Sequence, residues 1–211
     1  MPSAPPRPSP PRPSPSGLTV LALLIAGPLH PYGMQRLIKT WGKDQVVNIG
    51  QRANLYKTIR RLHEAGLIAV RHTERTQQYP ERTVYELTDE GRRAGTRWLE
   101  DMLATPRNEY PAFPAALSFA MLLAPGEVTR ILSQRLGAVR QRLAELDSQL
   151  QDERHVLPRI GVIETEYQRA VTDAEARWLG SVINDINSGR LFWDYSQIGP
   201  QAAQDYSQAT D

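Results

Sequence analysis

The first part of the chain shows apolar residues at helical spacing. Residues 18–26 (LTVLALLIA) form a short apolar run that ends before Gly27-Pro28, which predicts a short buried helix. Apolar positions then recur three and four places apart in residues 31–42 and 51–65, which predicts two amphipathic helices. These positions are Met34, Leu37, Ile38 and Trp41 in the first helix and Leu55, Ile59 and Leu62 in the second.

The pattern changes after the second amphipathic helix. Residues 66–73 and 83–88 are short and contain β-branched residues, so they predict two strands of a hairpin around a polar loop of residues 74–82. Acidic residues then open a further helix that extends from Asp89 to about Leu103. Three helices, a hairpin and a closing helix are the elements of a winged helix-turn-helix.

The second half of the chain is predicted to be almost entirely helical. A short piece at 114–123 precedes two long helices at about 126–155 and 160–188. The first long helix has apolar residues at heptad spacing, which form a seam along one side, and the second has a similar apolar pattern. The seam positions are Leu132, Leu136, Val139, Leu143, Leu146 and Leu150, then Tyr167, Val171, Ala174, Trp178, Val182 and Ile186. The seam could pack within one chain or against a second copy. Two long amphipathic helices with no other domain to cover them favour a homodimer.

These patterns predict a mainly α protein with one small β-hairpin and four segments. Residues 1–16 contain eight Pro and four Ser and are expected to form a disordered tail. Residues 17–105 would be a winged-helix DNA-binding domain, residues 106–195 a dimerisation domain of long antiparallel helices, and residues 196–211 a flexible tail.

Charge is segregated along the chain. Residues 36–82 hold ten basic and four acidic side chains, a net charge of +6, whereas residues 106–211 hold ten basic and fourteen acidic ones, a net charge of −4. This asymmetry is expected when one part of a protein meets a polyanion and the other does not. An uneven surface charge without a partner gives the same counts, so charge alone leaves both interpretations open.

The helix at 51–65 has the side chains that a major-groove reader needs. No acid occurs from residue 50 to residue 63, although exposed helices usually mix both signs. Its first turns and neighbouring segments supply base-reading and phosphate-binding groups. The predicted base readers are Gln51, Arg52 and Asn54, with Tyr56 beside them, and the predicted phosphate contacts are Lys57, Arg60, Tyr32 and Arg75. The alternative for the helix is that it presents an ordinary solvated face. The alternative for the hairpin loop that contains Arg75 is that it is a mobile polar loop.

Three blocks of the sequence resemble the PadR-like transcriptional regulators. They are GPLHPYGMQRLIKTWG, ANLYKTIRRLHEAGLI and RTVYELTDEGR, and the resemblance covers about residues 17–95. It implies a homodimeric winged-helix repressor of a nearby operon that a small effector releases, with the C-terminal helices as the dimerisation domain. Ala53-Asn54 stands where that family commonly has Gly followed by Thr or Ser, so the base preference is not carried over.

An effector site is the least specified part of this hypothesis. Aromatic residues could line a pocket for a small lipophilic or aromatic molecule between the DNA-binding domain and the dimerisation helices. The candidates are Trp98, Phe119, Tyr167 and Trp178, together with Phe113. The alternative is that these aromatic side chains belong to the core.

Other function classes have little support. The chain has no cysteine, four scattered histidines and no nucleophile, P-loop or zinc-protease motif, so we expect no catalytic residues, metal or cofactor. It shows neither a membrane-length apolar run nor a secretory signal, which favours a cytoplasmic location. The main alternative to a DNA-binding regulator is a winged-helix module that binds other proteins without specific DNA binding.

Overall fold

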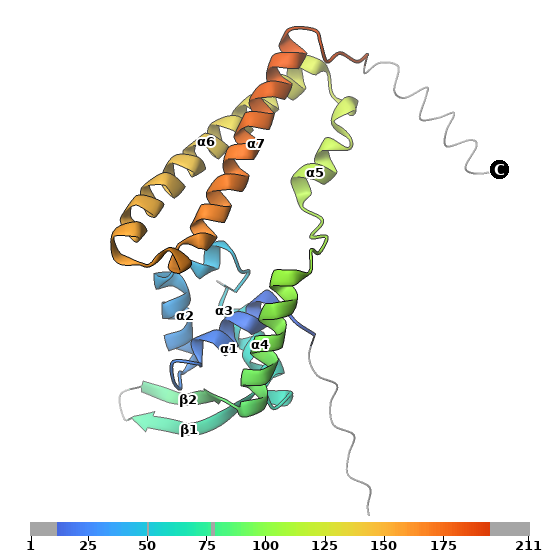
Figure 1. Cartoon of the computed structure of the whole chain (residues 1–211). Coiled ribbons are helices and arrows are strands. Elements are labelled where there is room, and N and C mark those ends of the chain that lie inside the picture. The colour runs from blue at the N-terminus through green and yellow to red at the C-terminus, as the bar shows by residue number, and fades with distance from the viewer. Residues whose placement is uncertain (1–11, 50, 77–78, 195–211) are drawn as a thin grey trace, which may run out of the picture. The chain divides into compact units, whose positions relative to one another are not determined.

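The computed structural model describes residues 12–49, 51–76 and 79–194 of the 211-residue chain. Contacts divide the chain into two units, Met1–Asn108 and Glu109–Asp211 (Figure 1). The first unit combines helices with one hairpin, and the second is helical. In the part that the structure describes, no helix is both long and apolar enough to cross a membrane.

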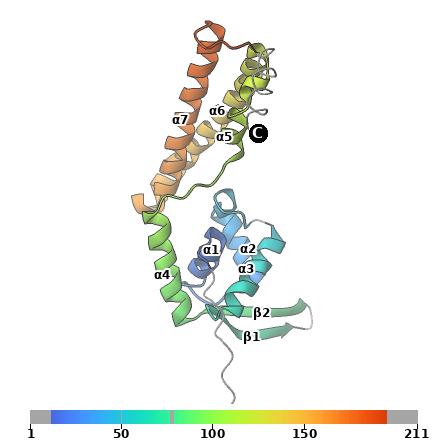
Figure 2. The same cartoon turned by 90° about the vertical axis from the view of Figure 1, so that its right-hand side faces the viewer.

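The first unit is a winged helix-turn-helix, and this confirms the predicted fold class. Its elements are α1 (Pro15–Leu23), α2 (Pro31–Thr40), the short 3-10 turn η1 (Lys43–Gln45), α3 (Arg52–Glu64), β1 (Ile68–Thr76), β2 (Tyr79–Leu87) and α4 (Asp89–Ala104). The hairpin extends away from the three-helix cluster, with α3 leading directly into β1 (Figure 2). The chain order therefore places the wing immediately after the helix with the acid-free face.

The first helix begins earlier than its apolar run suggests. Ser14 is the N-cap of α1, and its hydroxyl accepts a hydrogen bond from the backbone N–H of Gly17 at 3.2 Å. Arg61 of α3 also donates to the Ser14 hydroxyl, at 2.6 Å. Pro15 and Ser16, which the sequence pattern assigned to the tail, thus belong to α1, because proline is well tolerated in a first helical turn. Residues 1–11, which make up most of the rest of the predicted tail, lie outside the described residues.

The core of the first unit is formed by the apolar faces of all four helices and by the start of β1. The predicted inward positions of α2 and α3 are buried, apart from the half-buried Leu37 and the exposed Trp41. Trp41 is 53% exposed because α2 ends at Thr40 and Trp41 becomes its C-cap. The main buried side chains of this core are Val20, Leu21, Met34, Ile38, Leu55, Ile59, Leu62, Ile68 and Trp98.

The wing is longer than the hydrophobic pattern indicates. β1 and β2 pair antiparallel through most of the stretch predicted as a loop at 74–82, with Glu74 opposite Arg82 and Thr76 opposite Tyr79. The prediction of a long polar loop is therefore wrong. Backbone hydrogen bonds define strand pairing, so a polar stretch without apolar alternation can still form a strand. Register shifts at Val70/His72 and Glu74/Thr76 interrupt the ladder.

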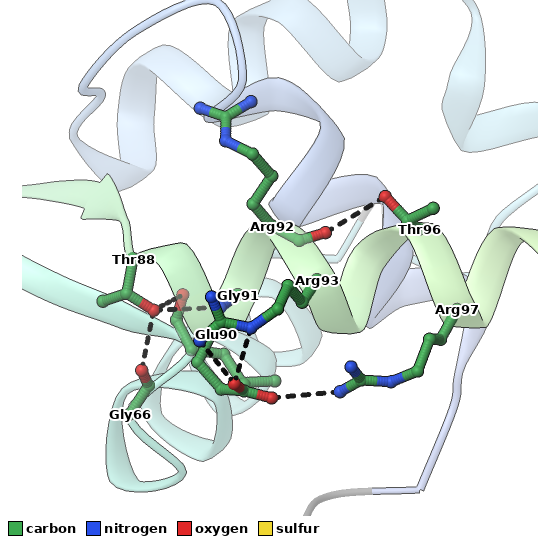
Figure 3. A network of polar contacts seen from close by, with 9 residues as sticks. Gly66, Thr88, Glu90, Gly91, Arg92, Arg93, Thr96 and Arg97 are labelled. Carbon is green, nitrogen blue, oxygen red and sulfur yellow. Dashed lines mark hydrogen bonds and ion pairs between the residues drawn. The ribbon is translucent and has the colours of Figure 1, made fainter.

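A threonine joins the hairpin to the last helix of the unit (Figure 3). Thr88 is the N-cap of α4, and its hydroxyl accepts a hydrogen bond from the Gly91 N–H at 3.0 Å. The same hydroxyl donates toward the carbonyl oxygens of Gly66 at 2.8 Å and Leu67 at 2.9 Å. The junction between α3 and β1 is thereby fixed on the first turn of α4.

An ion cluster lies on the outer side of this turn (Figure 3). Glu90 accepts hydrogen bonds from Arg93 at 2.8 Å and from Arg97 at 3.0 Å. The guanidinium groups, Arg93 first, hold the pKa of the Glu90 carboxyl below its ordinary value of 4.5. Glu90 also lies in the first turn of the helix, where a negative charge is favourable.

The second unit contains a short helix and two long antiparallel ones. Its elements are α5 (Ala112–Leu117), the 3-10 turn η2 (Ala120–Leu122), α6 (Pro125–Val156), the 3-10 turn η3 (Arg159–Gly161) and α7 (Ile163–Asn187). α6 and α7 run side by side in both views (Figures 1 and 2). Their shared core contains Val128, Leu132, Leu136 and Leu179.

The two long helices follow their predicted seams unequally. On α6 the seam is buried at Leu132, Leu136, Leu146 and Leu150. On α7, the side chains that meet α6 include the buried Leu179 and the half-buried Ile183, both next to predicted seam positions. Within one chain, part of the predicted α7 seam therefore remains exposed. Its apolar members Tyr167, Val171 and Trp178 are 70%, 49% and 44% exposed.

Candidate nucleic-acid interface

Helix α3 has one buried face and one exposed cationic face. Leu55, Thr58, Ile59 and Leu62 are buried and fix the orientation of the helix. The exposed residues on the other side are Arg52, Tyr56, Lys57, Arg60 and Arg61. Glu64, in the last helical position, is the only acid of α3. The exposed face is therefore strongly positive over three helical turns.

The first turn of α3 presents Gln51 and Arg52. Gln51 is the exposed N-cap, and its side chain makes no capping hydrogen bond. Arg52 lies over the ring of Tyr56, with its guanidinium carbon 5.5 Å from the ring centroid and Nη2 3.5 Å from the phenol oxygen. That hydrogen bond raises the pKa of Arg52. The stacked pair keeps a planar cation at the start of the helix, where first-turn N–H groups also lack helical partners.

Asn54, a predicted base reader, has a partner within the chain. Its side-chain amide donates to the side-chain oxygen of Asn48 at 3.3 Å, and the residue is half-buried. Its backbone carbonyl accepts a hydrogen bond from Thr58 at 2.8 Å. To read a base, Asn54 would have to exchange its contact with Asn48 for the base edge.

Two predicted phosphate contacts come together on the middle of α3. Lys57 and Arg60 are exposed, and neither has an acidic partner within the described ranges 12–49, 51–76 and 79–194. Together with Tyr56 they line a surface cavity of about 370 Å³. Cations that the fold leaves unpaired are available to an external anion.

The other predicted phosphate contacts lie elsewhere in the first unit. Tyr32, at the start of α2, is 62% exposed and stacks on His30, with their ring centroids 6.1 Å apart. His30 is the N-cap of α2 and accepts a hydrogen bond from Gly33 at 2.8 Å. The backbone of Arg75 lies in β1, and its side chain is outside the described part.

Sequence reasoning missed two residues of the α3 cavity. His63 and Tyr85 also line it, with their rings edge to face and the centroids 6.0 Å apart. His63 follows Tyr56 and Arg60 at helical spacing, so the period of α3 could have found it. Tyr85 comes from β2, and no local pattern connects it with α3.

The candidate effector residues do not gather at one place within either unit. Trp98 is buried in the core of the first unit. In the second unit Phe119 and Tyr167 are exposed, and Trp178 contacts Phe113 edge to face at 6.2 Å. A cavity of about 470 Å³ does lie in this unit, between α5, η2 and α6. Of the candidates, Phe113 lines it, whereas Trp98, Phe119, Tyr167 and Trp178 do not.

That cavity is largely apolar with one cation at its edge. Arg135 lies over the ring of Phe113 at 3.5 Å and pairs with Glu175 at 2.6 Å. The apolar lining residues include Phe113, Leu117, Leu123, Val128, Ile131 and Leu132. The geometry suits a flat apolar group more than a charged one, because Arg135 is already paired.

A three-helix cluster with a cationic helix, α3, beside a hairpin places the first unit in the class of winged helix-turn-helix proteins. Residues 20–97, most of the first unit, match the model of the transcriptional regulator PadR-like family. The family match therefore covers the winged-helix segment, 78 of the 211 residues of the chain. The resemblance noted in the sequence is thereby confirmed.

Solved structures share the fold over more than the matched segment. The chain is similar to Bacillus subtilis PadR in complex with operator DNA, with 19% identity, a TM-score of 0.65, and 81% of this chain and 98% of that chain covered. It is similar to the same protein in complex with p-coumaric acid, with 18% identity, a TM-score of 0.62, and 82% and 98% covered. The Vibrio cholerae virulence activator AphA shows 16% identity, a TM-score of 0.62, and 82% and 98% coverage. No curated protein matches the sequence.

Proposed function

We propose that this chain is a sequence-specific DNA-binding transcriptional regulator that acts as a homodimeric repressor and is released by a small molecule. The exposed face of α3 carries the proposal, because Arg52, Lys57 and Arg60 project from it and no acid lies among them. A helix of this composition can contact guanine through arginine and phosphate through lysine. Bacillus subtilis PadR, whose fold is similar, has been solved in complex with operator DNA, and this supports the same use of the fold.

Homodimerisation is supported by apolar surface on the second unit. Tyr167, Val171 and Trp178 form an exposed stripe on α7, and Phe119 and Leu122 near α5 are 66% and 60% exposed. A monomer would leave this surface in water, and exposed apolar patches of this kind mark protein interfaces. A two-fold dimer would place two α3 helices about 34 Å apart, in successive major grooves of a pseudo-palindromic operator.

The dimer surface can be tested by placing a charge on it. Val171→Asp should convert the dimer to a monomer in sedimentation equilibrium, because the carboxylate would have to be buried without a partner. Ser148→Asp, at an exposed position of α6, is the matched control and should leave the assembly unchanged. A Val171→Asp protein that still sediments as a dimer would show that the stripe lies outside the interface.

The effector is proposed to be a small lipophilic or aromatic molecule. Its support is the cavity of about 470 Å³ in the second unit, which is within the range of small-molecule sites. The complex of Bacillus subtilis PadR with p-coumaric acid provides an example of an aromatic ligand on this fold. Adding hydroxycinnamic acids and other flat aromatic compounds to a preformed DNA complex should identify compounds that release it.

The decisive experiment measures binding to DNA from upstream of the chain's own gene. Fluorescence anisotropy compares this duplex with a scrambled duplex over a salt series. We expect tighter binding to the upstream duplex and a log affinity that falls linearly with log salt. Equal affinity for both duplexes would argue against this operator, and absence of binding at low salt would overturn the proposal in favour of a protein-interaction module.

A further inference from the structure

The cavity on α3 is built from two elements that are distant in sequence. Along α3 it is lined by Ala53, Tyr56, Lys57, Ile59, Arg60 and His63, and β2 contributes Tyr85. Ile59 is 2% exposed and forms an apolar floor. The cavity therefore lies where the middle of α3 meets the root of the wing.

The chemistry of the cavity is that of an anion site. Lys57 and Arg60 supply positive charge, the two tyrosines supply hydroxyl donors, and no acidic residue is part of the lining. The phenol of Tyr85 has no hydrogen-bond partner in the part of the chain that the structure describes. An unpaired donor beside two unpaired cations suits an oxyanion with several acceptor oxygens.

Tyr85 is also held firmly in place. Its backbone N–H and carbonyl both pair with Leu29, at 3.0 Å each, and this bridge ties β2 to the segment before α2. The rings of His63 and Tyr85 are arranged edge to face, with their centroids 6.0 Å apart. The hydroxyl therefore belongs to a fixed scaffold and is not carried by the outer part of the wing.

We propose that this cavity seats one phosphate of the DNA backbone, with Lys57 and Arg60 neutralising it and the Tyr85 hydroxyl donating a hydrogen bond to a phosphate oxygen. The proposal rests on the proposed function and adds Tyr85 as a DNA-contacting residue, with His63 holding its ring. A phosphate fixed at this point would set the depth and rotation of α3 in the major groove, because backbone contacts determine register.

The test removes one hydroxyl and one charge. Tyr85→Phe, Lys57→Ala and the double variant are measured against a duplex of arbitrary sequence over a salt series, since a phosphate contact acts on any sequence. Tyr110→Phe is the matched control, because Tyr110 is 82% exposed and belongs to the second unit. Thermal unfolding should be the same for Tyr85→Phe and the unmodified chain, because its hydroxyl makes no hydrogen bond within the described part of the fold.

The two single variants should differ in their effect on the salt dependence of DNA binding. Tyr85→Phe should weaken binding about tenfold without changing the salt slope, because it removes a hydrogen bond to a charged group and no charge. Lys57→Ala should weaken binding and reduce the slope by about 0.9, the value for one lost phosphate contact. If both groups hold the same phosphate, the combined loss should fall short of the product of the single losses by at least about threefold.

Each alternative outcome points to a different failure. If the unmodified chain binds no duplex, the proposed function and this inference both fail. If it binds and Tyr85→Phe behaves like Tyr110→Phe, only the phosphate cavity is refuted. If the single losses multiply without coupling, Lys57 and Tyr85 contact different groups and the shared site is wrong.

Discussion

The junction of wing and closing helix depends on a glycine that leaves no space for a side chain. An ideal Cβ on Gly91 would lie 1.9 Å from the carbonyl oxygen of Leu67 and 2.9 Å from the Cδ1 atom of Leu87. Cβ atoms essentially never approach other atoms closer than 3.0 Å, so Gly91→Ala must push the Leu67 carbonyl and α4 apart by about 1.1 Å. We expect this substitution to destabilise the first unit markedly.

The cost can be worked out from the bonds that this movement breaks. The Leu67 carbonyl accepts hydrogen bonds from the Thr88 backbone at 3.2 Å and from the Thr88 hydroxyl at 2.9 Å. Losing both costs about 1 kcal/mol each, and overpacking adds about 1–3 kcal/mol. The higher helix propensity of alanine offsets roughly 1 kcal/mol of this destabilisation. The net destabilisation is therefore about 2–4 kcal/mol.

Hydrogen exchange of the full chain measures this cost locally. The core amides of α3 should exchange roughly 30-fold to 1,000-fold faster in Gly91→Ala, whereas α6 and α7 should not change. Gly95→Ala is the matched control in the same helix, because the nearest atoms, from Leu21, are 3.7 Å from its ideal Cβ. Alanine there should slow exchange slightly. If the core amides of α3 exchange in Gly91→Ala within a factor of two of their rate in the unmodified chain, the close approach of Gly91 to the Leu67 carbonyl is refuted.

Four further changes test other parts of the molecule. Arg52→Ala should cost about 1–3 kcal/mol of operator affinity and relax base preference at one position, measured with single-base operator variants; an unchanged preference would remove Arg52 from the base readers. Ser14→Ala should lower the stability of the first unit by about 1 kcal/mol in hydrogen exchange, because it removes the cap of α1. Leu179→Ala should cost the second unit about 2–5 kcal/mol by the same method, since this side chain is fully buried. The ionised Glu90 carboxylate, whose pKa is lowered by Arg93, contributes stability that is present above pH 4.5 and lost as the pH falls below it. Glu90→Gln should therefore show a shallower fall of the thermal midpoint in acid.

Much of the helical fold could be predicted because burial leaves a periodic signal. The apolar faces of α2 and α3 and the seam of α6 follow directly from positions three and four apart. The wing could not be delimited in this way. Glu74 pairs with Arg82 and Thr76 with Tyr79 through the backbone, although residues 74–82 show no apolar alternation in sequence and look like a polar loop.

The sequence could not assign a partner to the seam predicted for α7. Hydrophobic periodicity identifies the apolar side of α7 without saying what covers it. Leu179 is buried in the core shared with α6, whereas Tyr167 and Val171 are exposed within one chain. Tyr85 shows the same limit, because its position beside Lys57 depends on how β2 packs and on no feature of its own segment.

The pairing of charges distinguishes α3 from the two long helices of the second unit. On α6 and α7 most arginines are engaged by acids of the same unit, as in Arg135–Glu175, Arg154–Glu166, Arg169–Asp147 and Arg177–Asp173. On α3, Lys57 and Arg60 have no such partner in the described part of the chain. An exposed ion pair contributes little to stability, so this difference has only a small effect on the fold. Its larger effect concerns binding, because a paired arginine must lose its acid before it meets a phosphate, whereas an unpaired lysine only displaces water and salt ions. The first unit is therefore the one prepared to bind a polyanion, although both units carry many arginines.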